Sequence, residues 1–317
     1  MNPNVVEAIV PDAGTNHAAV TGEPVSCFQM PGFRRGPPTT SPSPIPGISP
    51  WQMGHVTLAL MNIEEVIERF RWELRNLQWD GENLEQSAAV TRRITSIRNA
   101  CDITCFAVNN ENAEELIREE IIRAQALKVA LEWKVFSFDF SGFVPRLKSA
   151  GFSVGEREAM VVYDLNAGLH PFEEPGRDSV HRVTGVEMLG DFQSAYTAAF
   201  SQDCSATVAQ LAEALQAGRS GHDAYLAYVD GVPASVGRLY THPKSAFAGL
   251  YGGGTSPSYR GRGLYRAIVA ARARDALKAG ARYLLVDAMP TSLPILLRLG
   301  FVRVAESWPC TLDFSPK

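Results

Sequence analysis

A glycine-rich segment between a predicted strand and a predicted helix constrains this chain more than any other feature. Residues 252–264 read Gly-Gly-Gly-Thr-Ser-Pro-Ser-Tyr-Arg-Gly-Arg-Gly-Leu. The apolar run at 246–251 predicts a strand, and the helical spacing of apolar residues from Leu264 onward predicts an amphipathic helix. The first N–H groups of a helix lack intrahelical partners and the helix dipole is positive there, so this turn predicts a phosphate or pyrophosphate site. Gly261 and Gly263 would let the backbone approach such a ligand closely.

Two common glycine-rich turns do not fit this spacing. A Rossmann turn needs a third glycine at position 266, which is arginine, and a P-loop needs Gly-Lys followed by Ser or Thr, which does not occur. The chain has instead Arg-x-x-Gly at 260–263 after Pro-x-Tyr, then a helix, a Gly280 turn, a strand at 283–286 and a short helix ending in Leu-Gly-Phe at 299–301. This order of elements resembles the acetyl-CoA-binding core of the GNAT superfamily of N-acetyltransferases, over roughly residues 179–317.

The resemblance implies an acyltransferase that moves an acetyl group from acetyl-CoA to a primary amine by direct attack. The pantetheine arm would run along the strand at Gly253, Gly254 and Thr255. Further cofactor contacts are implied at the turn, at Arg260, Gly261, Arg262, Gly263, Leu264 and Tyr265. The reaction needs a base that takes a proton from the ammonium group, and often an acid that protonates the leaving thiolate. The candidates are Asp287, as base, and Ser292, as a hydrogen-bond partner of the thiol, although either could simply cap a turn or helix.

The chain departs from the family pattern at three positions. Tyr265 stands where the family has a small residue, Leu296 where a tyrosine often acts as general acid, and Tyr251 near a position often held by a carboxylate. These departures keep a second function open, that of a non-catalytic acyl-CoA-binding or regulatory protein. His242 is a lone histidine in a predicted loop, which is typical of solvated surface and not of a catalytic group.

The first half of the chain repeats the same order of elements in a weaker form. A strand at 133–136 followed by Leu-Lys-Ser-Ala-Gly-Phe at 147–152 parallels the strand at 283–286 and the segment 296–301, with nearly the same separation. The predicted fold class is therefore α/β (mixed α+β), with two tandem GNAT-like domains, each a central mixed, mostly antiparallel sheet flanked by helices. In the first half the position of the phosphate turn, 109–115, has no glycine and would repel a pyrophosphate. It carries three carboxylates, Glu111, Glu114 and Glu115.

These features predict four segments. They are a Pro-rich, largely irregular extension at 1–50, a degenerate GNAT-like domain at 51–166, a linker at 167–178 and an acetyltransferase domain at 179–317. Apolar periodicity and capping signals predict helices at 63–77, 112–126, 144–150, 189–199 and 208–215, and strands at 90–97, 103–108, 131–136, 159–165 and 180–186. An Asp-Gly turn at 230–231 predicts a hairpin.

Composition excludes several classes of protein. The 317 residues carry a formal net charge of -4, which argues against a nucleic-acid or acidic-membrane partner. A local group of arginines suits a phosphorylated ligand or a solvated helix face: Arg260, Arg262, Arg266, Arg272 and Arg274. The five cysteines show no metal-ligand spacing, so no metal is expected. No signal peptide and no apolar stretch of about 18 residues is seen, which predicts a cytoplasmic protein whose partners are acetyl-CoA and an amine-bearing acceptor.

Overall fold

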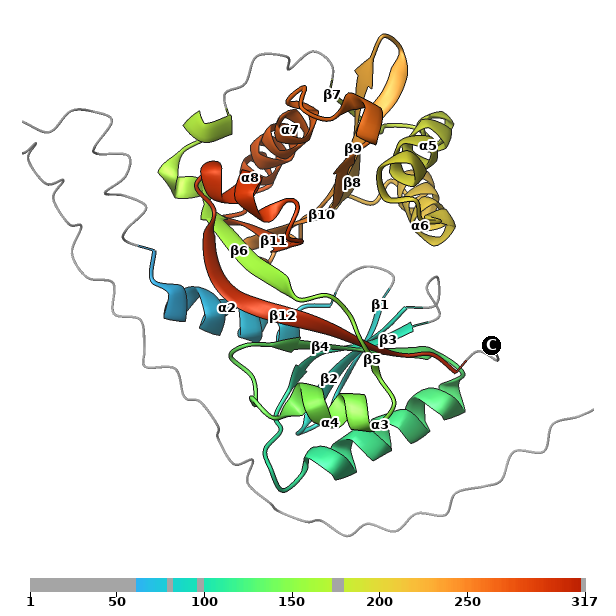
Figure 1. Cartoon of the computed structure of the whole chain (residues 1–317), viewed down its shortest axis with the longest axis vertical. Coiled ribbons are helices and arrows are strands. Elements are labelled where there is room, and N and C mark those ends of the chain that lie inside the picture. The colour runs from blue at the N-terminus through green and yellow to red at the C-terminus, as the bar shows by residue number, and fades with distance from the viewer. Residues whose placement is uncertain (1–60, 79–81, 96–99, 173–179, 315–317) are drawn as a thin grey trace, which may run out of the picture. The chain divides into compact units, whose positions relative to one another are not determined.

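A computed structural model of the chain describes residues 61–78, 82–95, 100–172 and 180–314 (Figure 1). The predicted extension at 1–50 lies outside these residues, and so does the part of the predicted linker from 173 to 178. Within the described ranges no helix is both long and apolar enough to cross a lipid bilayer.

The first half of the described chain begins with a capped helix, as predicted. The Asn62 side chain accepts hydrogen bonds from the N–H groups of Glu64 (3.1 Å) and Glu65 (3.3 Å), which satisfies two donors that the helix itself leaves open. The strand β1 was not predicted, because its polar sequence lacks an apolar alternation. The elements in order are α2 (Ile63–Asn76), β1 (Glu82–Gln86), β2 (Val90–Thr95), β3 (Ala100–Phe106), α3 (Ala113–Leu127), β4 (Ala130–Phe136), α4 (Phe143–Ser149), β5 (Ser153–Val154) and β6 (Glu158–Asp164).

The second half contains the predicted hairpin, in which Asp230 and Gly231 both have positive φ angles, 52° and 78°, as a type I′ turn requires. The predicted strand at 180–186 is shorter, because residues 186–188 form a 3-10 turn before α5. The final strand, β12, was not predicted. The elements in order are β7 (Val180–Arg182), α5 (Leu189–Phe200), α6 (Ser205–Gln216), β8 (His222–Val229), β9 (Val232–Tyr240), β10 (Phe247–Thr255), α7 (Leu264–Lys278), β11 (Tyr283–Ala288), α8 (Leu293–Arg298) and β12 (Val302–Leu312).

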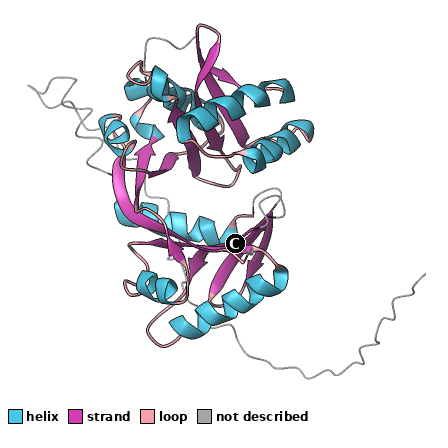
Figure 2. Ribbon diagram, turned by 45° about the vertical axis from the view of Figure 1, so that its right-hand side comes forward, coloured by secondary structure: helices cyan, strands magenta, loops and turns pink. Residues whose placement is uncertain are grey.

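All the strands belong to one sheet, with the order β1-β2-β3-β4-β12-β6-β11-β10-β9-β8-β7 and β5 beside β12 (Figure 2). Among the described strands only the pairs β3–β4 and β10–β11 are parallel. The fold is therefore mixed α/β, with a central and mostly antiparallel sheet flanked by helices, as predicted.

The two halves exchange their last strands. Strand β6 of the first half pairs with β11 of the second, and β12 of the second half pairs with β4 of the first, while β6 and β12 also pair with each other. A fragment that ended at residue 166 would thus leave β4 without its β12 neighbour. The division into separate domains at 51–166 and 179–317 stays a prediction, and the sheet itself runs through both halves.

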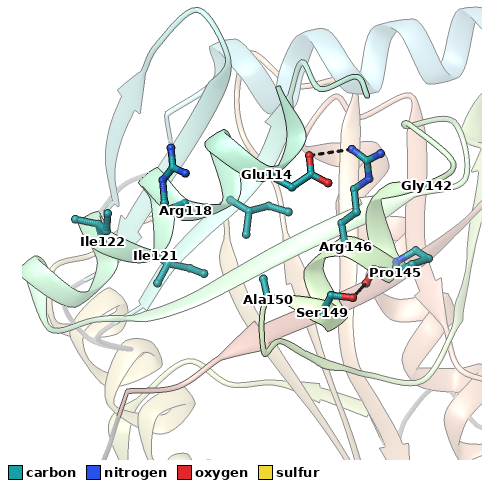
Figure 3. Close-up of a pocket in the computed structure, with 10 residues that line it drawn as sticks. Glu114, Arg118, Ile121, Ile122, Gly142, Pro145, Arg146, Ser149 and Ala150 are labelled. Carbon is teal, nitrogen blue, oxygen red and sulfur yellow. Dashed lines mark hydrogen bonds and ion pairs between the residues drawn. The ribbon is translucent and has the colours of Figure 1, made fainter. Parts of the chain in front are cut away.

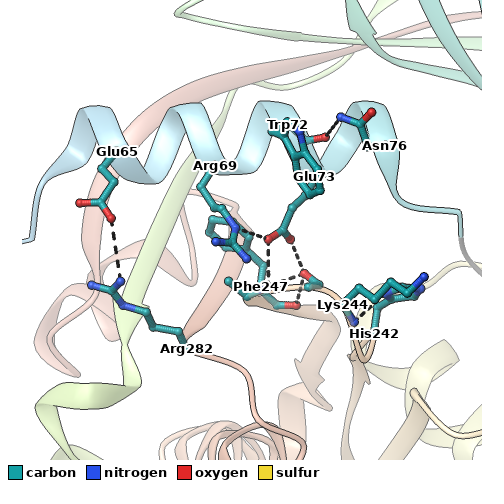
Figure 4. Close-up of polar contacts among 11 residues, drawn as sticks. Glu65, Arg69, Trp72, Glu73, Asn76, His242, Lys244, Phe247 and Arg282 are labelled. Atoms are coloured by element: carbon teal, nitrogen blue, oxygen red, sulfur yellow. Dashed lines mark hydrogen bonds and ion pairs between the residues drawn. The ribbon is translucent and has the colours of Figure 1, made fainter. Parts of the chain in front are cut away.

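Helix α2 also joins the two halves (Figure 4). Its buried Glu73 accepts hydrogen bonds from the Ser245 hydroxyl and from the Ala246 N–H (3.0 Å), in the loop that leads into β10. Phe70 packs edge-on against Phe136 of β4 and Phe247 of β10, with ring centroids 5.5 and 5.7 Å apart. This contact fixes the start of β10, the strand that leads to the glycine-rich turn.

Candidate active site

The parallel strands β10 and β11 separate before either strand ends. Their backbone pairing covers three positions, from Phe247 opposite Tyr283 to Gly249 opposite Leu285. Beyond that point β11 continues against β6, and β10 continues against β9. The facing edges of the two strands are therefore unpaired with each other over their second halves, so an extended ligand could pair with the backbone there.

The three glycines at the end of β10 belong to the strand and are packed against protein side chains. Gly252 has a φ angle of +52°, and the pairing with β9 is irregular here. A Cβ at Gly253 would lie 3.0 Å from the ring of Tyr265 on α7, and a Cβ at Gly254 would lie 2.5 Å from the ring of Phe200 on α5. Close packing by two helices thus requires small residues here, independently of any ligand.

The turn that follows β10 has the backbone conformation that its glycines predict. Gly261 and Gly263 have φ angles of +76° and +79°, in the left-handed region that a residue with a side chain rarely adopts. Gly263 is the N-cap of α7, which begins at Leu264, and no side chain caps this helix. Apart from the adjacent residues, no described atom lies within 4 Å of the position that a Cβ would take at either glycine, so the described residues leave space around the turn.

The side chains around the turn are engaged with the protein. The Arg260 Nε donates to the Thr255 carbonyl oxygen (3.2 Å), and the Thr255 hydroxyl lies 2.8 Å from the Ser235 hydroxyl. The Arg262 guanidinium lies over the Tyr259 ring, 5.4 Å from its centroid. An anion at this turn would therefore meet backbone N–H groups with arginine side chains at its margin.

Two residues predicted separately, Tyr265 and Ser292, lie together where α7 and α8 begin. Burial raises the pKa of the Tyr265 hydroxyl, while the positive charge of Arg272 and a hydrogen bond with Ser292 lower it by smaller amounts. The Ser292 hydroxyl also donates to the Met289 carbonyl oxygen at 3.2 Å. Leu296, at the position of the family's tyrosine, is fully buried in the core. The phenol at this end of the site thus comes from α7 and not from α8.

Arg272 does not belong to a solvated or ligand-facing row of arginines. Only 1% of its surface is exposed, and its Nη1 donates to the carbonyl oxygens of Arg238 (3.1 Å) and Tyr251 (3.4 Å). Burial lowers its pKa to about 10. Among the described residues no carboxylate forms an ion pair with it, so its charge is held against backbone carbonyls beside Gly253.

Asp287 lies in a polar cluster that the sequence did not predict. Its carboxylate is 3.2 Å from the Lys134 ammonium of β4 and accepts a hydrogen bond from the Ser307 hydroxyl of β12 at 3.2 Å. Lys134 also forms an ion pair with Glu158 of β6. Although Tyr251 is partly exposed as a whole residue, burial around its hydroxyl and the negative charge of Asp287 raise its pKa to about 12. No local signal could have revealed this cluster, because it depends on the exchanged strands.

Other candidate groups lie elsewhere. The His242 Nδ1 accepts the Lys244 N–H at 3.1 Å within the β9–β10 loop (Figure 4). In the described parts of the chain, no three His, Cys, Asp or Glu side chains gather in a group that could hold a metal ion.

The first half has a cavity, but it is located between α3 and α4 (Figure 3). Its volume is about 700 Å³, and its walls are mostly apolar side chains such as Ile117, Ile121 and Ile122. At its rim Arg146 pairs with Glu114 (3.3 Å). Glu114, one of the three carboxylates at the position of the phosphate turn, is thus partly neutralised by the guanidinium of Arg146.

Comparisons with known proteins agree with this architecture. Residues 186–301 match the model of the acetyltransferase (GNAT) family. A GCN5-related N-acetyltransferase from Kribbella flavida has a similar structure, with a TM-score of 0.57 and 17% identity, over 81% of this chain and 97% of that one. A functionally unknown conserved protein from Staphylococcus epidermidis ATCC 12228 has a TM-score of 0.57 and 14% identity, over 76% of this chain and 97% of that one. No curated protein sequence matches the chain.

A third solved structure, a GCN5-related N-acetyltransferase from Sphaerobacter thermophilus, has a TM-score of 0.51 and 10% identity, over 80% of this chain and 86% of that one. At these identities the structural likeness shows the fold alone. For the protein from Kribbella flavida this likeness covers 81% of the chain and so includes residues of both halves. Taken with the family match, the separating strands β10 and β11 and the glycine turn before α7 identify residues 186–301 as a domain of the GNAT acetyltransferase family.

Proposed function

We propose that the chain transfers an acetyl group from acetyl-CoA to a primary amine, by direct attack while both substrates are bound. The observation that carries this proposal is the separation of β10 and β11 after Gly249 and Leu285, next to helix α7, which begins at Leu264 without a side-chain cap. An extended thioester arm can pair with the open strand edge while its pyrophosphate lies at the helix N-terminus.

The residues predicted to contact acetyl-CoA suit these two tasks. Gly253, Gly254 and Thr255 lie on the stretch of β10 that no longer pairs with β11. At the turn the contacts would come mainly from the backbone N–H groups of Gly263, Leu264 and Tyr265. Arg260, Gly261 and Arg262 shape the turn and add positive charge at its margin.

The chemistry combines one acyl transfer with proton transfers at the amine and at the thiol. Asp287 takes one proton from the bound ammonium, which frees the nitrogen lone pair. The nitrogen forms a bond to the thioester carbon, the C–S bond breaks, and the thiolate leaves with the electron pair. The nitrogen then loses a second proton to water, and the thiolate takes one from the Tyr265 hydroxyl, which Ser292 orients. Tyr265 recovers its proton from solvent, so the net products are the amide, the thiol and one released proton.

Release of free thiol tests this function directly. The full chain is incubated with acetyl-CoA and a panel of primary amines, and thiol is measured together with the acetylated amine. We expect one thiol for each amide formed with at least one amine of the panel. Asp287→Asn should lower kcat on that amine by about 100-fold or more, as loss of a general base commonly does. Asp230→Asn, in the exposed β8–β9 turn, is the matched control and should leave kcat unchanged.

A second function is favoured by one observation, the burial of Leu296 where the family often has an acidic hydroxyl. A chain without any proton donor at the thiol could bind acyl-CoA as a regulatory protein and release little or no thiol. Saturable acetyl-CoA binding without thiol release on any amine would support this alternative. Thiol release that Tyr265→Phe lowers, with acetyl-CoA binding intact, would instead support the catalytic assignment of Tyr265.

The first half is proposed to be a copy of the fold that does not bind acetyl-CoA. Its residues 109–112 hydrogen-bond to one another, and its cavity has Glu114 at the rim. This half contributes instead to the sheet and to the surroundings of Asp287, through β4 and β6.

A further inference from the structure

Four neighbouring strands bring one polar side chain each to the same place. Lys134 lies on β4, Ser307 on β12, Glu158 on β6 and Asp287 on β11, and these strands are adjacent in that order in the sheet. Lys134 bridges the two carboxylates, at 3.2 Å from Asp287, and Ser307 donates to Asp287 at 3.2 Å. We call these four residues the interhalf cluster.

The cluster is partly buried and carries an unequal number of charges. The side chains of Lys134, Glu158 and Asp287 are 16%, 18% and 24% exposed, so solvent and small ligands still reach them. Burial works against the charge on Lys134, but the two carboxylates outweigh burial and raise its pKa, so it stays protonated. With both carboxylates ionised, one negative charge is left without a cation from the cluster.

The position of the cluster relates it to the site of acyl transfer. Asp287 lies on β11 beyond the last residue that pairs with β10, and Tyr251 lies at the corresponding stretch of β10. Burial and, to a smaller extent, the negative charge of Asp287 raise the pKa of Tyr251 to about 12. The charged or titratable groups that act on this place are Lys134, Glu158 and Tyr251, with Arg238 and Tyr240 beyond Tyr251.

We propose that the first half completes the amine side of the site: Lys134 positions the Asp287 carboxylate, and the residual negative charge of the interhalf cluster binds the acceptor as a cationic primary amine. This inference rests on the proposed acetyl transfer and names the class of acceptor and the contribution of the other half. Lys134 is a positioning residue, because it acts through Asp287. Glu158 also pairs with Lys134, so Lys134 neutralises only part of the Asp287 charge. The remaining negative charge can attract the ammonium group of the acceptor.

A binding experiment tests the charge preference without any turnover. The probes are n-hexylammonium, 1-hexanol and hexanoate, which have chains of equal length and different charge, titrated calorimetrically into the full chain. We expect saturable binding of hexylammonium, at least tenfold tighter than hexanol, and no binding of hexanoate. Asp287→Asn and Glu158→Gln should each weaken hexylammonium binding at least fivefold. Equal binding of the ammonium and the alcohol would overturn the cationic-acceptor assignment, even if the chain acetylates amines.

A kinetic experiment tests the role of Lys134. With the best amine of the panel, Lys134→Met should lower kcat by about tenfold or more and leave the KM for acetyl-CoA unchanged, because the Asp287 carboxylate loses the ion pair that positions it. Lys134→Arg keeps the charge and should retain most of kcat. Lys148→Met, on the exposed side of α4, is the matched control and should leave kcat unchanged.

The comparison of kcat with stability distinguishes positioning from a purely structural ion pair. A lower melting temperature of Lys134→Met with an unchanged kcat would show that Lys134 only stabilises the sheet and would overturn its role. Should Lys134→Met not fold, the double variant Lys134→Met/Glu158→Gln is used in its place, because it removes one charge of each sign. Its reference is Glu158→Gln, and equal kcat values of these two variants would count against the proposal. Absence of turnover on every amine would refute the proposed function alone, because the hexylammonium titration still decides the binding claim.

Discussion

Each half of the sheet contains one parallel strand pair, and the two pairs differ in the residues beyond their last paired positions. In the first half β3 and β4 pair from Ala100 to Ile103, and in the second half β10 and β11 pair from Phe247 to Gly249. Three residues beyond the last pair, β3 carries Phe106 and β10 carries Gly252. The first half thus has an aromatic ring at the position where the second half has a glycine, over which the side chains of Tyr196 and Arg238 lie.

The space beyond β3 is filled by an aromatic cluster. The rings of Phe106, Trp133 and Phe143 lie with centroids 5.0 to 5.5 Å apart, and all three residues are buried. The turns differ in their internal hydrogen bonds. In the first half the Asn109 side chain accepts from the N–H groups of Glu111 (2.8 Å) and Asn112 (3.1 Å), which precede α3, while neither α3 nor α7 has a side-chain cap. A GNAT-like half can therefore keep its strands and lose its ligand site when its own side chains fill the space beyond its parallel strands.

The largest expected effect comes from the aromatic cluster. Trp133→Ala should lower the free energy of unfolding by about 3–5 kcal/mol, because it opens a cavity among rings that no ligand fills. Trp133→Phe keeps an aromatic ring and should lower the free energy of unfolding by a smaller amount. Tyr251→Ala, in the second half, should lower it by less than half as much as Trp133→Ala, since Tyr251 is 41% exposed. Urea unfolding of the three variants measures this. Equal losses of unfolding free energy in Trp133→Ala and Tyr251→Ala would contradict this difference between the two halves.

The next effect comes from the ligand. Acetyl-CoA at 100 times its dissociation constant should stabilise the chain by about 2.7 kcal/mol, since it binds the folded state only. The melting temperature with and without millimolar acetyl-CoA measures this effect, with adenosine as the control ligand that lacks the pyrophosphate and the thioester arm. An unchanged melting temperature would contradict the assignment of the open half as the acetyl-CoA site.

The sequence revealed local features and missed those that depend on distant partners. The start of α7 and the turn at Asp230 follow from residues a few positions apart, so both could be predicted. The pairing of β12 with β4 joins the two halves of the chain, and no short-range pattern encodes it. For the same reason Asp287 could be named as a candidate from the end of its strand, while its partner Lys134 could not.

The glycines of β10 show a further limit of reading a sequence. Their number predicted a close approach of backbone and ligand, but Gly253 and Gly254 also accommodate Tyr265 and Phe200. Packing and ligand binding require the same small residues there, so the sequence alone does not separate the two causes. At Gly261 and Gly263 no described side chain packs against the glycine. Packing therefore does not require glycine there, but the positive φ angle does.

A smaller effect is expected at the turn itself. Gly263→Val should weaken acetyl-CoA binding by more than tenfold, about 1.4 kcal/mol, because a β-branched residue disfavours a φ angle of +79° and would crowd the first N–H groups of α7. Calorimetric titration of the folded variant measures this. Arg262→Ala is the contrast: Arg262 stacks on Tyr259 at the surface, so its loss should weaken binding less. The reverse order of the two effects would mean that side-chain charge and not the helix N-terminus holds the anion.

The smallest effect is expected at the rim of the first-half cavity. Glu114→Gln removes an exposed ion pair with Arg146 and should change the free energy of unfolding by less than about 1 kcal/mol. It also removes a carboxylate that would repel a pyrophosphate. If charge alone had closed the first half to acetyl-CoA, this variant would bind a second molecule per chain. We expect the stoichiometry to stay at one, because the rings of Phe106 and Trp133 still fill the strand separation. Calorimetry with acetyl-CoA counts the sites, and a stoichiometry of two would show that repulsion, and not internal packing, distinguishes the two halves.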